Sequence, residues 1–188
     1  MDQPEIRIVG RGIVLREWTA NDLPAMVGLF NDPGVAYRTP VESPFGLEAA
    51  GAYFRRVQRT RVEGTRVHLA ITVDGGAACG EVLLNLDRGT IGYTVGAAFR
   101  GQGLARRAAD LMTSYAHRVV GMAQVLAEIE PDNHASIAVA EGTGYRLTGS
   151  EPEQVEDGRR SYSLRTWIHE APAPVPCFPG PDDAGVNR

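Results

Sequence analysis

The segment Ile91-Gly-Tyr-Thr-Val-Gly-Ala-Ala-Phe-Arg-Gly-Gln-Gly-Leu-Ala105 decides the fold, because it predicts a short strand, a glycine-rich turn and the start of a helix. Apolar residues follow the turn at helical spacing, at Leu104, Ala108, Leu111, Met112, Tyr115 and Val119. The first amides of a helix have no intrahelical partner, and the helix dipole favours an anion there. Because Gly101 and Gly103 leave those amides uncovered, the segment is predicted to cradle a pyrophosphate.

Two common phosphate loops are excluded by the residues of the turn. A P-loop needs Gly-Lys followed by Ser or Thr, which Gly103-Leu104-Ala105 does not supply. A dinucleotide-binding loop needs a third glycine where Arg106 stands, and a leading βαβ unit. A tight connection between strand and helix would also explain the glycines, so only companion motifs can identify the ligand.

Such companion motifs are present. The residues Arg100 to Ala105 match the pattern Arg-x-x-Gly-x-Ala, and the chain resembles the GNAT superfamily of N-acetyltransferases, in which this pattern is the coenzyme A signature. The resemblance continues in Leu126-Ala-Glu-Ile-Glu-Pro-Asp-Asn-His-Ala-Ser136 and in Glu141-Gly-Thr-Gly-Tyr145. It is most similar to the branch that contains the RimJ/RimL-type N-terminal acetyltransferases of ribosomal proteins. The resemblance covers residues 13 to 167, and its specific part runs from 91 to 145.

Composition limits the class of protein. The chain has 188 residues, of which 43% are hydrophobic and 22% charged, so we expect one globular domain with a substantial core. A net charge of -4 disfavours a nucleic-acid partner. The two cysteines are far apart and no Cys/His cluster has metal-ligand spacing, so we expect no metal. There is no signal-peptide pattern and no membrane-spanning apolar run, which predicts a cytoplasmic protein with no membrane partner.

Periodicity and turn residues predict the order of elements. They are a strand over 13–17, a helix opened by a Thr19/Asp22 capping box and ended at 31–34, a helix from Ser43-Pro44 to Gly64, strands over 67–73, 78–86 and 90–95, the helix after the glycine turn, a strand over 124–130, a helix capped by Asn133 and ended by Gly144, and a hairpin of 145–150 with 161–167. This order predicts an α+β fold with a mixed, mostly antiparallel sheet flanked by helices. The resemblance implies the GNAT acetyltransferase fold, whose central strands splay apart. Residues 1–169 would form the N-acetyltransferase domain, and the proline-rich residues 170–188 a flexible tail.

The resemblance implies acetyl-CoA as the cosubstrate. Its pyrophosphate would bind at the signature residues Arg100, Gly101, Gln102, Gly103, Leu104 and Ala105, with Arg106 as a second cation. The pantetheine arm would lie between the splayed strands, against Tyr93, Thr94 and Val95, with a backbone amide near Val95 as donor to the thioester oxygen. Asn133 would cap its helix and also bond a pantetheine amide.

Glu128 is the predicted general base, because it matches the position of an acidic residue on this strand in the Rim-type enzymes. The alternative is structural. Leu126, Glu128 and Glu130 share one face of the strand, so the two glutamates could simply belong to a solvated face.

Ser136 is the predicted general acid, since it falls where the RimL-like branch has a serine. Many family members instead carry a tyrosine seven residues after the motif asparagine, a position held here by Ala140. Tyr93 and Tyr145 remain alternatives for the acid, and a small residue in a first helical turn also explains Ser136.

The resemblance thus implies an acetyl-CoA-dependent N-acetyltransferase that works by direct transfer in a ternary complex. The expected acceptor is a protein N-terminus, and a small amine such as an aminoglycoside or a polyamine is the alternative. A non-catalytic acyl-CoA-binding regulatory module also remains open, because Ala140 removes the usual proton donor. The sequence leaves a homodimer open.

Overall fold

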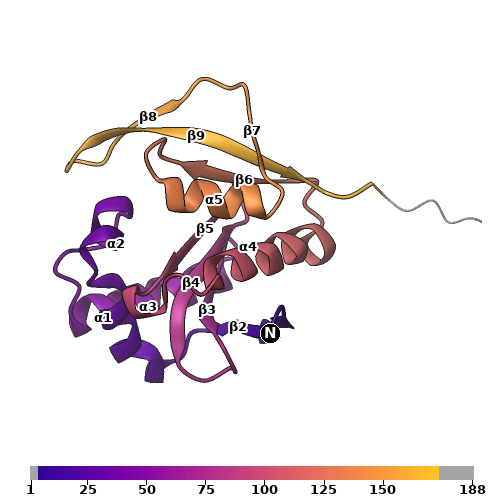
Figure 1. Ribbon diagram of the computed structural model, residues 1–188. Helices are drawn as coiled ribbons and strands as arrows, with labels where there is room; N and C mark the ends of the chain where they lie inside the picture. Colours follow the sequence, from indigo (N-terminus) through magenta and orange to yellow (C-terminus); the bar gives the residue numbers. More distant parts are fainter. Residues whose placement is uncertain (1–3, 174–188) are drawn as a thin grey trace, which may run out of the picture.

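The computed structural model describes residues 4–173 and forms one nine-stranded sheet with helices on both faces (Figure 1). The strands are β1 (Arg7–Gly10), β2 (Ile13–Glu17), β3 (Arg66–Thr72), β4 (Ala78–Asn85), β5 (Thr90–Val95), β6 (Gln124–Ile129), β7 (Arg146–Leu147), β8 (Glu153–Glu156) and β9 (Ser161–Glu170). The helices are α1 (Leu23–Phe30), α2 (Pro33–Arg38), α3 (Leu47–Val62), α4 (Leu104–Tyr115) and α5 (His134–Gly142), with short helical turns η1 (Ala20–Asp22), η2 (Ala97–Phe99) and η3 (Ala116–Val120).

The sheet has the order β1-β2-β3-β4-β5-β6-β9-β7, and β8 pairs with β9. Every neighbouring pair is antiparallel except β5 and β6, which run parallel. A parallel pair needs a crossover connection, and α4 supplies it between these two strands. The α+β class and the mixed, mostly antiparallel sheet are therefore confirmed.

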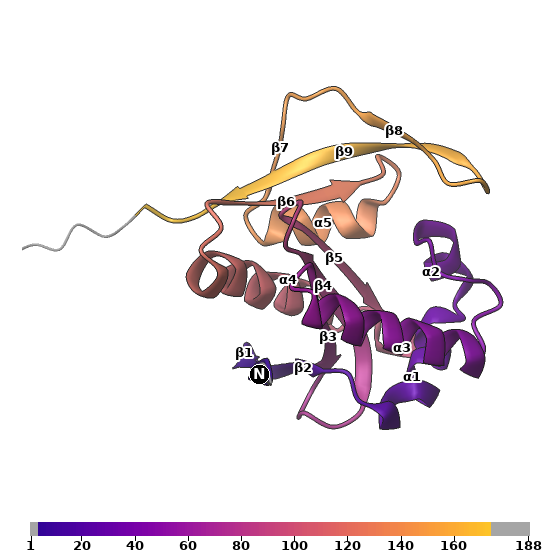
Figure 2. The ribbon, with the colours of Figure 1, turned by 180° about the vertical axis from the view of Figure 1, so that it is seen from behind.

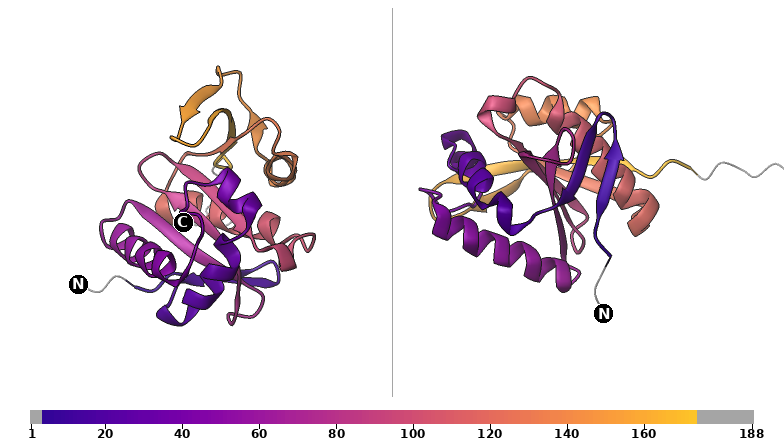
Figure 3. Two further views of the ribbon diagram at one scale, coloured as in Figure 1. Left: turned by 90° about the vertical axis from the view of Figure 1, so that its left-hand side faces the viewer. Right: turned by 90° about the horizontal axis from the view of Figure 1, so that it is seen from below.

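Helices α3 and α4 lie on opposite sides of the sheet (Figures 2 and 3). Alternation along the strands creates two apolar faces. Leu69, Val82 and Leu84 face α4 in one core cluster. Ala70 and Ala78 belong to a second cluster with the inner residues of α1 and α3. Each face of the sheet thus has its own core, and any opening through the sheet connects the two sides.

Such an opening exists between β5 and β6. The two strands are paired only at Thr90 with Leu126 and at Ile91 with Ala127, whereas β5 stays paired with β4 up to Val95. Beyond Ile91 the strands diverge, which confirms the predicted splay.

The structure corrects one predicted helix start. Ser43-Pro44 is a cis peptide and does not cap a helix. Helix α3 begins at Leu47 after Gly46. The reason is that two contacts fix Phe45. Its amide donates to Asn31 Oδ1 at 3.1 Å, and its ring packs in the core against Phe30 with the ring centroids 5.2 Å apart. These contacts hold the segment before Leu47 outside the helix.

Three elements were missed by the sequence analysis. Helix α2 follows directly on the turn that ends α1, with Asp32 as a cap that accepts from the Val35 amide at 3.0 Å. Strand β1 precedes the first predicted strand, and β8 pairs with the first half of β9. Strand β9 continues through Glu170, one residue into the predicted tail, while residues 174–188 of that tail lie outside the described part of the chain.

Candidate active site

A cleft of about 320 Å³ lies where β5 and β6 splay. It is lined from both faces of the sheet by residues of the two strands, namely Thr90, Ile91, Gly92, Tyr93 and Thr94 on β5 and Ala127, Glu128 and Ile129 on β6. Helix α5 contributes Asn133 and Ser136 near its start. Tyr53 of α3 and Tyr162 of β9 lie at its other walls. The opening between the strands is therefore a passage through the sheet.

The backbone of β5 directs amides into this passage. The Gly96 amide donates to the Cys79 carbonyl at 3.0 Å, which makes these two residues a hydrogen-bonded pair. By alternation Thr94 bonds toward β4, and the amides of Tyr93 and Val95 point the other way, toward β6. Since β6 has diverged there, these amides face the splay, as a donor to a thioester oxygen would have to do.

The glycine turn forms a bare helix N-terminus. Gly101 and Gly103 have φ of 77° and 69°, in the left-handed region that favours glycine. Gly103 precedes α4 with no side-chain cap, and a Cβ placed on either glycine would meet nothing within 4 Å. The first amides of α4 and the space in front of them are thus open to an anion. The side chain of Leu104, by contrast, is buried in the core.

The predicted arginines differ in placement. Arg100 is half exposed and pairs with Asp32 at 2.9 Å, and its guanidinium holds the pKa of that carboxyl below the usual range. The Arg100 Nε also donates to the Val95 carbonyl at 3.3 Å. The side chain of Arg106 lies against Gly142 of α5, where a Cβ placed on the glycine would be 3.1 Å from Arg106 Nε. Of the two, only Arg100 bridges the glycine turn and the end of β5.

Glu128 lies in the cleft but is not free. Its Oε1 accepts from Arg88 Nη2 at 2.7 Å, and its side chain is 21% exposed. Arg88 also approaches Glu153 of β8 at 3.6 Å. The predicted base therefore lies in the cleft, where it forms an ion pair with Arg88.

The start of α5 is bonded across the splay. Asn133 caps the helix by accepting from the Ser136 amide at 3.2 Å. The Tyr93 hydroxyl donates to the Ser136 carbonyl at 2.9 Å, and burial raises the pKa of this phenol above its usual range. Tyr93, Asn133 and Ser136, predicted from separate segments, are thus brought together at the passage.

Tyr145 and Ala140 do not reach the cleft. The Tyr145 hydroxyl is buried and shares a 2.7 Å hydrogen bond with Thr113 of α4. Ala140 is 2% exposed and packs in the core. Tyr145 is therefore not an acid for this site in the observed arrangement, and Tyr93 is the alternative that lines the cavity.

Two further carboxylates line the same cleft: Glu130, which the sequence analysis placed only on a possible solvated face but which is buried, and Glu81, which it missed. Glu130 accepts from both terminal nitrogens of Arg160 at 2.6 Å, which lowers the pKa of the carboxyl together with Arg38. Glu81 of β4 is 3% exposed and is bonded by Tyr53. The signal for Glu81 was present, since a carboxylate interrupts an otherwise apolar buried strand.

Within residues 4–173 no group of three His, Cys, Asp or Glu side chains could hold a metal ion. The same residues contain no helix with the length and hydropathy needed to cross a bilayer.

Comparison with known proteins agrees with this architecture. A curated relative, FsC-acetyl coenzyme A-N(2)-transacetylase of Aspergillus fumigatus, is 34% identical over 91 residues, which cover 44% of this chain and 39% of that protein. The match thus spans about two fifths of the relative's length.

Two solved structures share the fold. Microcin C7 self immunity acetyltransferase MccE, in complex with acetyl-CoA and AMP, has a TM-score of 0.73 at 17% identity and is covered over 94% by 86% of this chain. RimL, the ribosomal L7/L12 alpha-N-protein acetyltransferase, has a TM-score of 0.72 at 16% identity and is covered over 96% by 90% of this chain. The acetyltransferase (GNAT) domain family matches residues 13–146, which is more than half of the sequence. The chain belongs to the GNAT acetyltransferase family.

Proposed function

We propose that the protein transfers the acetyl group of acetyl-CoA to a primary amine by direct transfer, with a protein N-terminus as the acceptor. The observation that carries this proposal is the continuity of the passage through the sheet. The bare helix N-terminus at Gly103 follows directly on β5, and the cleft opens beside the same strand. A cosubstrate held at the turn can thus present an acyl group to an acceptor entering from the opposite face.

The residues present fit acetyl-CoA. The open space at Gly101 and Gly103 suits a pyrophosphate, and Arg100 is the cation beside it. The outward amides of Tyr93 and Val95 suit a pantetheine arm, and the Val95 amide would stabilise negative charge on the thioester oxygen. When bound, acetyl-CoA supplies the activated acyl group.

The chain's own residues would accept and donate the protons that the reaction transfers. An ammonium must lose a proton before it can act as a nucleophile, and carboxylates of the cleft are the groups available to accept it. The sequence predicts Glu128 for this role. Ser136, or Tyr93 next to it, would supply the proton that the sulfur takes up.

The choice of acceptor is supported by what related proteins act on. RimL is named as an alpha-N-protein acetyltransferase of ribosomal L7/L12, which favours a protein N-terminus. The name of the fungal relative, an N(2)-transacetylase, names no protein acceptor. A small amine remains the alternative. We further propose that residues 1–169 form the catalytic domain and that the protein is cytoplasmic.

A thiol-release screen tests the proposal. Purified protein with acetyl-CoA is mixed with peptides carrying free N-termini, with aminoglycosides or with polyamines, and free coenzyme A thiol is measured. The chain contains no lysine, so self-acetylation at lysine cannot contribute to the signal. Release of the thiol in the presence of peptides supports the proposal. Release with small amines alone would mean that the acceptor is a small amine and not a protein N-terminus. Tight binding of acetyl-CoA without release from any class would favour the regulatory module.

A further inference from the structure

Three carboxylates line the cleft, those of Glu81, Glu128 and Glu130, and Glu81 has no role in the mechanism above. Glu81 lies on β4, one strand further from the splay than β5, and its side chain is 4% exposed. It lines the same cavity as Tyr93 and Glu128. A buried carboxylate in a substrate cavity is costly unless it is bonded, so its partners indicate what it is for.

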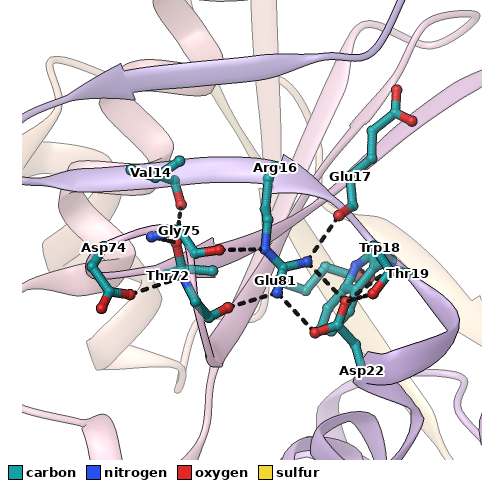
Figure 4. Close-up of polar contacts among 11 residues, drawn as sticks. Val14, Arg16, Glu17, Trp18, Thr19, Asp22, Thr72, Asp74, Gly75 and Glu81 are labelled. Atoms are coloured by element: carbon teal, nitrogen blue, oxygen red, sulfur yellow. Dashed lines mark hydrogen bonds and ion pairs between the residues drawn. The ribbon is translucent and has the colours of Figure 1, made fainter.

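The partners of Glu81 come from three different elements. The Tyr53 hydroxyl donates to Oε1 at 2.6 Å. The Trp18 indole donates to Oε2 at 3.0 Å, and Figure 4 draws Trp18 and Glu81. His68 Nδ1 lies 3.5 Å from Oε2. Among the described residues no arginine forms an ion pair with Glu81, and the chain has no lysine. Tyr53 and Trp18 thus hold the carboxylate as neutral donors, and no arginine of residues 4–173 pairs with it. The guanidinium of Arg56 lies over the ring of Tyr53 instead, 4.7 Å from the ring centroid.

The strand register places Glu81 closer to the reaction than Glu128. Glu81 pairs directly with Thr94, the residue before Val95, whose amide is the donor proposed for the thioester oxygen. Glu128 lies one residue beyond the last pair of β5 and β6, level with Gly92. Three residues of strand separate Gly92 from Val95, which is about 10 Å. Glu128 is in addition occupied by Arg88.

We infer that Glu81 binds the ammonium group of the acceptor and takes its proton, an inference that rests on the proposed function. An N–H bond of the ammonium breaks and its proton passes to the carboxylate. The freed nitrogen lone pair forms the N–C bond to the acyl carbon, the C–S bond breaks, and its electron pair leaves on sulfur. The nitrogen's second proton balances the thiolate, directly or through Ser136, and Glu81 returns its own proton to water. Glu128 with Arg88 then belongs to the binding wall of the cleft.

The test compares Glu81→Gln with wild type in thiol release from acetyl-CoA and a short peptide with a free N-terminus, at pH 6.8 and at pH 9.5. The pKa of a peptide α-amine is ordinarily about 7.8, so roughly a tenth of it is neutral at pH 6.8 and nearly all at pH 9.5. We expect the variant to lose about 10²- to 10⁴-fold in kcat/KM at pH 6.8. That deficit should shrink about tenfold at pH 9.5, because the amine then arrives without the extra proton.

Asp22→Asn is the matched control. Asp22 is also a buried carboxylate, 7% exposed and bonded to Arg16 (Figure 4). It is not among the residues that line the cleft. Asp22→Asn should lower the free energy of unfolding and leave kcat/KM within threefold of wild type at both pH values. A purely structural role for Glu81 predicts a deficit that is the same at both pH values, and this result would overturn the inference.

Two further results are decisive. Activity of Glu81→Gln within threefold of wild type at pH 6.8 would also overturn the inference while leaving the proposed function intact. No thiol release by wild type with any amine would overturn the proposed function, and this inference with it. Should Glu81→Gln fail to bind acetyl-CoA calorimetrically, Glu81→Asp, which withdraws the carboxylate by one methylene, gives the same comparison.

Discussion

The variant Gly103→Ala, compared with a matched control, should separate two roles of the glycine turn: its backbone conformation and its binding of acetyl-CoA. Gly103 has φ of 69°, and a Cβ there would meet no atom within 4 Å. The cost to folding is therefore conformational only, about 1 to 2 kcal/mol for an L-residue in the left-handed region. For a chain of this length that corresponds to a loss of about 2 to 8 °C in Tm.

Gly64 supplies a control that is matched in geometry. It follows α3 with φ of 70°, and a Cβ there would also meet nothing within 4 Å. Gly64→Ala should lower Tm by the same amount as Gly103→Ala. It is remote in sequence from the start of α4 and should leave acetyl-CoA affinity unchanged.

Of the two variants, only Gly103→Ala should weaken the binding of acetyl-CoA. The added methyl group enters the open space before the first amides of α4, where the phosphates would bind. Losing one charge-assisted hydrogen bond costs about 1.5 to 3 kcal/mol, which is about a 10- to 100-fold rise in Kd. Isothermal titration calorimetry measures it. Equal affinities of Gly103→Ala and Gly64→Ala, at equal loss of Tm, would refute the placement of the phosphates at this turn.

Three further predictions follow from the cleft. Glu130→Gln should lower the free energy of unfolding by about 1.5 to 3 kcal/mol at pH 7 in urea titrations, because it removes the charge-assisted hydrogen bonds from the partly exposed Arg160. Because Arg160 lowers the pKa of Glu130, the folded chain keeps this carboxylate ionised at pH values where the unfolded chain protonates it. The difference in unfolding free energy between variant and wild type should therefore hold at neutral pH and shrink below about pH 4.3. A difference that stays constant with pH would contradict this prediction. Ser136→Ala should lower kcat with acetyl-CoA affinity within threefold of wild type, whereas a large loss of affinity in calorimetry would make Ser136 a binding residue. Glu128→Gln should raise the KM for the acceptor and keep the pH dependence of wild type, and a variant that loses this dependence would restore Glu128 as the base.

Much of the fold follows from local chemistry. The Thr19/Asp22 capping box forms, with the Thr19 amide donating to the Asp22 carboxylate at 2.8 Å. The strand over 90–95 and the helix start after Gly103 have the predicted bounds, because turn glycines mark both ends. Such features depend on a few neighbouring residues and can be read along the chain.

Other features depend on distant contacts. Helix α3 starts at Leu47 since Phe45 is anchored by Asn31 and Phe30, which no local pattern reports. Helix α2 could have been predicted, because Asp32-Pro33 is a cap followed by a proline in the first turn.

The site shows the same division. The glycine turn and the Asn133 cap are local motifs, and the structure places both beside the splay. The pairing of Glu128 with Arg88 depends on the register of the sheet and on the turn before β5. The cluster around Glu81 draws on four segments, so only the folded chain brings it together.

A crystal structure of the protein with coenzyme A would test the central claim most directly. We expect the pyrophosphate against the amides of Gly101 to Ala105 and the pantetheine arm beside the Tyr93 and Val95 amides, between β5 and β6. Coenzyme A bound elsewhere, with the glycine turn and the splay empty, would contradict the account.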